Sequence, residues 1–380
     1  MPNKILYLQY TNPAGYPPLE HSSRILAERG WQVLFIGTEA QGSKHLRFPY
    51  HQRIAVQQMP FQPAGWRQKL HYLRFCLWAF RWAVRWRPSW IYVSDALACP
   101  AALVLRRLPG LRFIYHEHDS PDNELPDNPF QRVVLRTRRH MAHHAAICIL
   151  PNQQRLEHFL KVTGANPQHS LCVWNCPRLD EVAQPRATRT GDPLTLYYHG
   201  NIGLHSLPRT ILEAMRAYPG RVQLHIVGYE TIGTLGYLKQ FQQLAATIGL
   251  ADALHINSPQ SRFALWSGMQ GSDIGLGLVM GNDINLRMMV GASNKVFDYL
   301  AAGLPVLVPD TPDWKRTFVE PGYGRACNPN DAKSITGALH QWLEHPDEIR
   351  AMGEQGRQRI LSDWNYERQF TPVLDYLCNY

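Results

Sequence analysis

The sequence predicts an α/β protein of two doubly wound, Rossmann-like domains that face each other across a cleft. Short apolar segments of strand length alternate with longer segments of helical periodicity, which is typical of parallel sheets covered by helices. This alternation runs through residues 1–175 and starts again at residue 194. A chain of 380 residues with 45% hydrophobic content can fill two cores. Because ligands of such sheets bind at the carboxyl ends of the strands, we expect the site in the cleft.

The first predicted domain, residues 1–175, begins with an apolar strand at residues 4–10. Further strands are predicted at residues 32–36, 90–93, 111–115, 146–150 and 170–173, and helices at residues 19–29, 66–86, 96–107 and 130–144. Residues 176–193 contain Pro177, Pro185 and Pro193 but few apolar side chains, which indicates a linker.

The second predicted domain, residues 194–362, repeats the same pattern. Its strands are predicted at residues 194–198, 222–227, 253–256, 274–278 and 305–308, with helices between them. We expect residues 363–380 to form a helix that returns to the first domain.

Composition indicates the cellular compartment. No segment approaches the roughly 20 apolar residues of a membrane span, and the first strand is too short for a signal peptide. The seven cysteines are odd in number and include no Cys-x-x-Cys pattern, which favours a reducing environment. We therefore expect a cytoplasmic protein, with peripheral attachment to the inner face of the cell membrane as an alternative.

The formal charge of +9 is concentrated in the first half of the chain. Residues 40–94 contain no acidic residue but nine lysines and arginines, and residues 128–156 are a second acid-free stretch. Such a surface suits an anionic partner, which can be lipid headgroups, nucleic acid or a phosphorylated substrate.

The predicted helix 66–86 carries three lines of residues at helical spacing. The first is predicted to be a core stripe and consists of Trp66, Leu70, Leu73, Leu77, Phe80 and Val84. The second is basic and aromatic and consists of Arg67, His71, Arg74, Trp78, Arg81 and Arg85. A third line holds Phe75, Trp82 and Trp86. The second line suits an anionic membrane surface, while a merely solvated face is the alternative. Nucleic acid is disfavoured because the chain has no nucleic-acid-binding motif.

One carboxylate, Asp298, lies within a stretch that otherwise appears buried. Ser293 can cap a helix whose inward positions are Phe297, Leu300 and Ala301, and Gly303 ends it. Burying an unpaired charge is costly, so Asp298 needs a partner. Either a ligand supplies that partner, or Asp298 pairs with Lys295 or a nearby backbone N–H.

Glycines recur at the predicted strand ends of the second domain. Gly200 and Gly203 follow its first strand, and Gly228 ends the next. Glycine lets the backbone approach a phosphate closely, although a plain strand-to-helix turn explains a single such site equally well.

These motifs together resemble the donor domain of GT-B nucleotide-sugar glycosyltransferases, closest to family 4. The resemblance rests on Tyr-His-Gly near residue 200, Ile-Val-Gly at 226–228, and Ser-Asn-Lys-Val-Phe-Asp-Tyr-Leu-Ala-Ala-Gly-Leu-Pro-Val at 293–306. It covers most of residues 191–370. In the first half, residues 11–15, which end at Gly15, occupy the position of the family's glycine loop, and residues 27–33 resemble its second motif.

The resemblance implies a donor site for a nucleotide diphosphate sugar. Asp298 would bind the ribose, and Lys295 would stabilise the diphosphate with Ser293 and Asn294. The other donor-binding residues that we expect are Gly200, Asn201, Gly203, Gly228 and Arg287. The sequence departs from the family at Val290, where a glutamate is usual, and in the basic residues that usually follow the glycine loop. An inactive homologue therefore stays open, as does help from Arg209.

A polar segment, residues 116–119, follows the predicted strand 111–115 in the first domain. The resemblance suggests catalytic roles for His116 and Asp119 near the reacting carbon and acceptor contacts for Glu117, His118 and Gly15. A metal site is the alternative, since histidines and carboxylates are metal ligands. The chain has no Asp-x-Asp, which disfavours a metal-dependent transferase of GT-A type.

The resemblance predicts metal-independent hexosyl transfer with retention of configuration and without a cofactor. The acceptor can be lipid-linked, a polysaccharide or a small molecule. The alternatives are a nucleotide-sugar 2-epimerase on the same fold and an inactive scaffold docked on a membrane. The sequence leaves open the base, the sugar, the acceptor and the oligomeric state.

Overall fold

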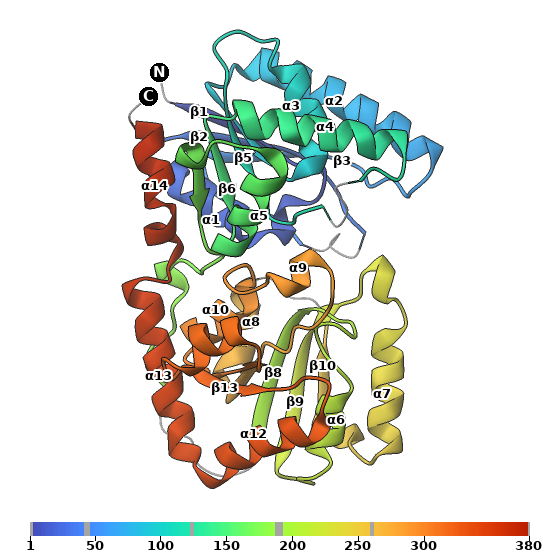
Figure 1. The fold of residues 1–380 in the computed structure, drawn as a ribbon, viewed down its shortest axis with the longest axis vertical. Helices are drawn as coiled ribbons and strands as arrows, with labels where there is room; N and C mark the ends of the chain where they lie inside the picture. Colours follow the sequence, from blue (N-terminus) through green and yellow to red (C-terminus); the bar gives the residue numbers. More distant parts are fainter. Residues whose placement is uncertain (1–2, 42–45, 122–124, 187–192, 259–261, 379–380) are drawn as a thin grey trace. The chain divides into compact units, whose positions relative to one another are not determined.

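The computed structural model describes residues 3–41, 46–121, 125–186, 193–258 and 262–378, apart from the side chains of Ile232 and Phe263. The chain divides into two compact units, one formed by Met1–Asn175 with Tyr366–Tyr380 and the other by Cys176–Asn365. Each unit contains one parallel β-sheet with helices on both faces (Figure 1). The predicted α/β class with two doubly wound sheets is confirmed.

The sheet of the first unit has seven parallel strands in the order β3-β2-β1-β4-β5-β6-β7. The strands are β1 (Lys4–Leu8), β2 (Gln32–Thr38), β3 (Ile54–Met59), β4 (Trp90–Ser94), β5 (Arg112–His116), β6 (Ile147–Leu150) and β7 (Ser170–Cys172). Strand β3 is missing from the sequence prediction. It lies at the edge of the sheet and is mostly half-exposed, so it lacks the apolar run by which buried strands are recognised.

Helices cover both faces of this sheet (Figure 1). They are α1 (Pro17–Glu28), α2 (Trp66–Trp86), α3 (Cys99–Leu105), α4 (Pro129–His144), α5 (Gln153–Thr163) and α14 (Tyr366–Cys378), with 3₁₀ turns at Pro13–Gly15, Ala96–Ala98 and Pro167–His169. Helices α2 to α5 pack on the face that carries Leu6 and Leu8, and α1 and α14 pack on the face that carries Ile5 and Tyr7. The last helix therefore completes the core of the first unit.

Helix α2 buries the face opposite to the one that the sequence predicts. Its buried residues are Tyr72, Phe75, Ala79 and Ala83. The predicted core stripe faces outward instead, with Leu73 60% and Leu77 64% exposed, and Trp66, Leu70 and Val84 exposed as well. The small side chains of Ala79 and Ala83 let the helix approach α3 and the sheet closely, which the bulkier leucines would prevent. The core-stripe prediction is therefore wrong.

The sheet of the second unit has six parallel strands in the order β10-β9-β8-β11-β12-β13. The strands are β8 (Leu194–Asn201), β9 (Val222–Tyr229), β10 (Leu254–Asn257), β11 (Ile274–Leu276), β12 (Val306–Pro309) and β13 (Gly324–Cys327). The helices are α6 (Thr210–Met215), α7 (Tyr237–Thr247), α8 (Arg262–Gln270), α9 (Ile284–Arg287), α10 (Asn294–Ala301), α11 (Pro312–Trp314), α12 (Ala332–Glu344) and α13 (Pro346–Ser362). Shorter turns lie at Leu179–Glu181, Ile232–Thr234 and Ala251–Ala253, and a π-helical turn at Lys315–Val319.

The segment predicted as a linker, residues 176–193, is part of the second unit where it is described, which is at residues 176–186 and 193. The Ala183 N–H donates to the carbonyl of Ala301, and Arg357 donates to the carbonyl of Ala183. Arg186 donates to the carbonyls of Gln270 and Ser272. Residues 187–192 lie outside the described residues. Because these hydrogen bonds join distant parts of the chain, local composition did not indicate them.

Candidate functional site

The candidate donor site lies where strand β8 ends beside the start of helix α10. Gly200 has a φ of +114°, which favours glycine, and a Cβ there would lie 3.5 Å from Lys295 Nζ. The Lys295 ammonium donates to the Tyr198 hydroxyl (3.1 Å) and lies 4.6 Å from the centre of its ring. The lysine is thus held beside the Gly200 backbone, which is half-buried.

Two further glycines of the predicted donor site are required by packing. A Cβ on Gly228 would lie 2.2 Å from the Gly200 carbonyl oxygen, because these residues are paired on β8 and β9. A Cβ on Gly203 would lie 2.6 Å from Thr234 Cγ2. Close packing therefore explains why these two positions are glycine, whether or not a phosphate binds beside them.

Asp298 is buried on α10, and its carboxylate is paired with a side chain that the sequence did not suggest. Arg262 Nη2 donates to Oδ1 (2.7 Å) and Nη1 donates to Oδ2 (3.1 Å). His199 Nε2 lies 3.4 Å from Oδ2. Arg262 also donates to both carboxylate oxygens of Glu181. The expected alternatives, pairing with Lys295 or with a nearby backbone N–H, are not what the structure contains.

This cluster has defined protonation states at neutral pH. Burial alone would raise the pKa of Asp298, but Arg262 and His199 outweigh it, and the pKa is lowered. Burial lowers the pKa of His199, although Asp298 partly opposes this. Asp298 is therefore a carboxylate, and His199 is a neutral imidazole that donates from Nε2.

The predicted donor site contains polar side chains next to Gly200 and Lys295 in the chain. Among the described residues, Asn201 Oδ1 and Asn294 Oδ1 are buried and have no hydrogen-bond partner. Ser293 is buried and precedes α10, but its side chain caps no N–H. Arg287 is exposed at the end of α9. Arg209 donates to Gln240, so its guanidinium is engaged on α7.

In the first unit, His116 ends strand β5 and His118 follows it, both buried. Their ring centres are 3.8 Å apart. The Tyr92 hydroxyl lies 2.6 Å from His116 Nδ1, whereas His116 Nε2 and both ring nitrogens of His118 have no partner among the described residues. Burial lowers the pKa of both rings, that of His118 to about 3, so both are neutral.

Glu117 serves a structural role in the described arrangement. Arg138 Nε donates to Oε2 (2.6 Å) and Nη2 donates to Oε1 (2.8 Å). The Tyr115 hydroxyl also donates to Oε2 (2.6 Å). Because Glu117 is fully buried and these bonds occupy both oxygens, they account for the residue without an acceptor contact.

The loop of His118 and Asp119 is fixed by Asp95 and Arg155, which the sequence analysis did not identify. Asp95 Oδ1 accepts the backbone N–H of His118 (2.7 Å) and that of Asp119 (3.4 Å). Asp95 has φ 64° and ψ 164°, a conformation that costs a non-glycine residue roughly 1–3 kcal/mol. Arg155 pairs with Asp119 at 3.3 Å, while the Asp119 carboxylate stays exposed.

Further buried polar groups lie at the same edge of the first sheet. Gln9 follows strand β1 and Ser94 ends strand β4, which pairs with β5 beside His116. Their side-chain polar atoms have no partner among the described residues. Gly15 has open space around it. Buried groups of this kind are usually satisfied by water or a ligand, so this edge is suited to a polar, uncharged ligand.

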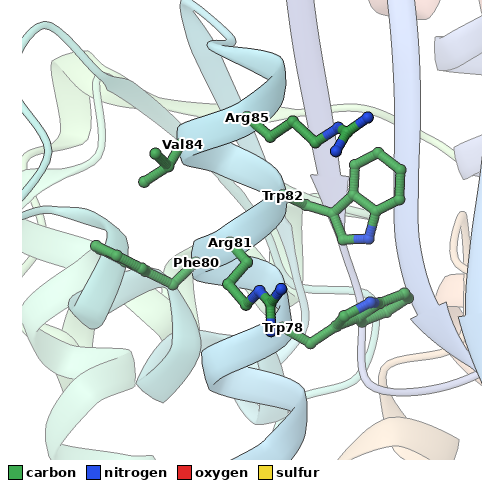
Figure 2. A pocket seen from close by; sticks show the side chains of 6 residues that line it. All are labelled: Trp78, Phe80, Arg81, Trp82, Val84 and Arg85. Carbon is green, nitrogen blue, oxygen red and sulfur yellow. The ribbon is translucent and has the colours of Figure 1, made fainter.

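The predicted membrane-facing residues lie on α2. Arg67, Arg74, Arg81 and Arg85 are exposed, and Trp78 is half-buried. Figure 2 shows Phe80 and Val84 on one side of this helix and Trp78, Trp82 and Arg85 on the other, around a surface pocket. The Tyr72 and Phe130 rings lie 5.0 Å apart, so the second acid-free stretch, which forms α4, lies beside α2.

Among the described residues, no group of three or more His, Cys, Asp or Glu side chains could hold a metal ion. No helix in the described ranges is long and apolar enough to cross a membrane.

Comparisons with known proteins place this geometry in context. A family model described as glycosyl transferase-like matches residues 205–375, and one described as glycosyl transferase 4-like domain matches residues 19–174. No curated protein matches the chain in sequence.

Solved structures with the same fold cover nearly the whole chain. Sucrose-phosphate synthase from Thermosynechococcus elongatus has a TM-score of 0.72 at 15% identity, covering 99% of this chain and 98% of that one. HepE from Anabaena, in complex with UDP and glucose, has 0.71 at 14%, covering all of both chains. WaaG, a glycosyltransferase involved in lipopolysaccharide biosynthesis, has 0.69 at 14%, covering 97% and 98%. At these identities the likeness shows the fold.

Proposed function

Because the chain belongs to the GT-B glycosyltransferases of group 1, we propose that it moves a hexose from a nucleoside diphosphate sugar with retention of configuration. The acceptor is a lipid-linked, polysaccharide or small-molecule hydroxyl. One observation carries this proposal, namely the Lys295 ammonium beside the Gly200 backbone, one helical turn from Asp298. HepE was solved with UDP, so UDP is the first nucleotide to test.

Lys295 has the charge and the position to stabilise the leaving group. When the glycosidic bond breaks, negative charge grows on the departing diphosphate, and a fixed cation stabilises it more than it stabilises the ground state. Asn294 precedes this lysine and Asn201 follows Gly200 in the chain, and each amide carries N–H donors that can bind phosphate. We propose that this set works without a metal or cofactor.

The neutral histidines of the first unit suit an acceptor or a transferred sugar. His116 Nε2 and the ring nitrogens of His118 can exchange hydrogen bonds with sugar hydroxyls without placing a buried charge beside them. The exposed Asp119 carboxylate adds an acceptor for a hydroxyl proton. The departing phosphate itself can take the proton of the acceptor hydroxyl, so no carboxylate nucleophile is required.

The exposed face of α2 supports attachment to an anionic membrane, on its cytoplasmic side. Leu70, Leu73 and Leu77 project from the protein beside Arg74 and Arg81. Apolar side chains that alternate with arginines can enter the headgroup region while the guanidinium groups bind lipid phosphates. The absence of acidic residues from 40–94 removes the repulsion that would oppose this contact.

A thermal-shift screen with UDP, GDP and ADP tests the donor proposal. At 100 times its dissociation constant a nucleotide should stabilise the protein by about 2.7 kcal/mol. Lys295→Met, which keeps the aliphatic stem, should weaken binding and lower the turnover of the sugar nucleotide. An undiminished rate in EDTA is expected. No response to any of the three nucleotides would contradict the proposed donor.

The acceptor proposal is tested with His116→Asn and Asp119→Asn. Each variant should lower the rate of sugar transfer while the nucleotide affinity changes less than about twofold, because both residues belong to the first unit. Transfer kinetics that match the wild type in both variants would reject these roles.

Co-sedimentation with anionic and neutral vesicles tests the membrane proposal. Changing Arg67, Arg74, Arg81 and Arg85 to Gln should abolish most binding to anionic vesicles, since each charge contributes about 1 kcal/mol. The control changes Arg216, Arg221, Lys239 and Lys333, which are exposed on the second unit, and removes the same charge. Equal losses in both variants would indicate a net-charge effect and not a docking face.

A further inference from the structure

The surface pocket beside helix α2 is used neither by the donor site nor by the histidines of the first unit. Its volume is about 840 Å³, which lies in the usual range for ligand sites. Figure 2 shows Trp78, Trp82 and Arg85 on one side of the helix, while Phe80 lies on the opposite side. With Arg81, the first three side chains form a wall that a ligand on their side of the helix can contact.

Arginines continue this wall along the helix. Arg67, Arg74, Arg81 and Arg85 are exposed and are separated by seven, seven and four residues, so they follow one side of a helix with about 3.6 residues per turn. At roughly 1.5 Å per residue, the row is about 27 Å long, which accommodates several sugar units. The whole set, which we call the arginine–tryptophan flank, consists of Arg67, Arg74, Trp78, Arg81, Trp82 and Arg85.

The two tryptophans of the flank present flat apolar surfaces in fixed positions. Trp78 and Trp82 are half-buried, and both pack against the core of the first unit. Their ring centres are 6.5 Å apart, and the rings are nearly perpendicular, at 88°. A pyranose carries apolar C–H groups on its faces, so it can pack on an indole ring, and a rigid ring loses little conformational entropy when it binds. The pair is therefore suited to a saccharide.

The polar groups of the flank are all hydrogen-bond donors. Guanidinium and indole N–H groups donate and cannot accept. None of the described residues that line the pocket is acidic, and residues 40–94 contain no acidic residue. A neutral sugar needs acceptors for its hydroxyl protons, which the flank does not supply. Carboxylate, sulfate and phosphate groups only accept, so an acidic saccharide matches the flank in both hydrogen bonding and charge.

The apolar ridge of α2 is a different surface from the flank. Leu70, Leu73 and Leu77 form the ridge that we propose for the membrane. Leu77 and Trp78 are consecutive, so their side chains point about 100° apart around the helix. A lipid chain finds its aliphatic contacts on the ridge, because the flank contains no aliphatic side chain. The combination of arginine and tryptophan on the flank favours a saccharide instead.

We propose that the arginine–tryptophan flank binds an extended acidic saccharide, whose sugar rings stack on Trp78 and Trp82 and whose anionic groups pair with the arginines. The flank belongs to the first unit, whereas the proposed donor site belongs to the second. The proposal therefore goes beyond the donor site and does not depend on nucleotide binding.

Calorimetric titration of the wild-type protein with three oligomers of equal length tests the proposal. Hexagalacturonate has sugar rings and carboxylates, maltohexaose has the rings alone, and hexaglutamate has the carboxylates alone. Hexagalacturonate should bind roughly tenfold or more tightly than either comparator, because only this oligomer combines stacking with ion pairs. Equal affinity for hexaglutamate would show a general anion surface and overturn the proposal, as would a lack of binding by hexagalacturonate.

Trp78→Leu and Trp82→Leu test the stacking. Each should lower the affinity for hexagalacturonate roughly threefold to tenfold and leave that for hexaglutamate unchanged. Trp78→Phe and Trp82→Phe keep an aromatic ring and should lose less. Trp66→Leu is the matched control, because Trp66 is exposed on the same helix but lies outside the flank. An equal loss in this control, or equal losses for both oligomers, would contradict stacking on the flank.

Vesicle binding separates this site from the membrane proposal. Trp78→Leu and Trp82→Leu should keep most of their co-sedimentation with anionic vesicles, whereas Leu73→Ser with Leu77→Ser should lose vesicle binding and keep hexagalacturonate binding. If the tryptophan variants lose vesicle binding but keep hexagalacturonate binding, the flank is a lipid surface and the proposal fails. Melting temperatures show whether a lost affinity reflects unfolding, and the wild-type comparison of oligomers does not depend on any variant.

Discussion

Each unit contains an arginine paired with a buried carboxylate near the carboxyl edge of its sheet, and the two pairs differ in their surroundings. In the first unit, the side chains of Arg138 and Glu117 are 2% and 0% exposed, and the Tyr115 hydroxyl also donates a hydrogen bond to the carboxylate. In the second, Arg262 is 15% exposed and divides its guanidinium between Asp298 and Glu181, with His199 beside them.

The difference shows that a buried carboxylate in a motif is not by itself a ligand site. Glu117 and Asp298 both stand in segments that the sequence analysis assigned to substrates. Arg262 also bonds to Glu181, so it keeps a carboxylate if its pair with Asp298 is broken. The pair around Glu117 is fully buried and stabilises a loop, whereas the Asp298 pair lies beside a partly exposed arginine.

Glu117→Gln should show the largest effect, on stability. It leaves the Arg138 charge buried without this carboxylate, and breaking such a pair costs about 3–5 kcal/mol. Urea unfolding measures the change. Asp313→Asn is the control, because the exposed pair of Asp313 with Arg316 should contribute less than about 1 kcal/mol. A loss as small as that of the control would remove the distinction between the two regions.

Asp298→Asn should cost less stability than Glu117→Gln, roughly 1–3 kcal/mol, because Arg262 keeps Glu181 as a partner. Its main effect should be a roughly tenfold or greater loss of nucleotide affinity. Urea unfolding and titration with UDP measure the two effects on the same variant. An undiminished affinity for UDP would show that the Asp298 pair, like the Glu117 pair, contributes to stability and not to nucleotide binding.

The third expected effect, roughly 2 kcal/mol at pH 5, concerns the pH dependence of stability and the loop that follows Glu117. Burial lowers the pKa of His118 from its usual 6.5 to about 3, so the unfolded chain binds more protons between these values. The contribution of His118 to the free energy of unfolding is therefore fully present above pH 6.5. It falls by about 1 kcal/mol per pH unit as the pH decreases toward 3.

Unfolding free energies between pH 5 and 8 check this expectation. His118→Gln should have a shallower slope below pH 6.5 than the wild type, because the glutamine does not titrate. The Asp298 carboxyl should not contribute there, since its pKa is lowered, whereas His116 and His199, whose pKa values burial lowers, add a slope that both proteins share. Equal slopes in the two proteins would mean that His118 is accessible to protons in the folded state.

Local patterns predicted much of the architecture. Apolar runs identified most of the strands, and the periodicity of residues 293–303 located α10 with Phe297, Leu300 and Asp298 on its buried side. They failed where the pattern was weak, as in β3, or where more than one helical face was apolar. Helix α2 offered more than one such face, and close packing through its small alanines decided between them.

The sequence by itself determined the two alternating α/β halves, the buried position of Asp298 and the basic, acid-free character of α2, because these depend on residues that are close along the chain. Only the tertiary structure decided which cation holds Asp298 and which side of α2 meets solvent. Arg262 is 36 positions from Asp298 and stands in no motif, and the two side chains meet only in the folded second unit. Charge pairing and face selection depend on the free energy of contacts between distant segments, which no local pattern contains.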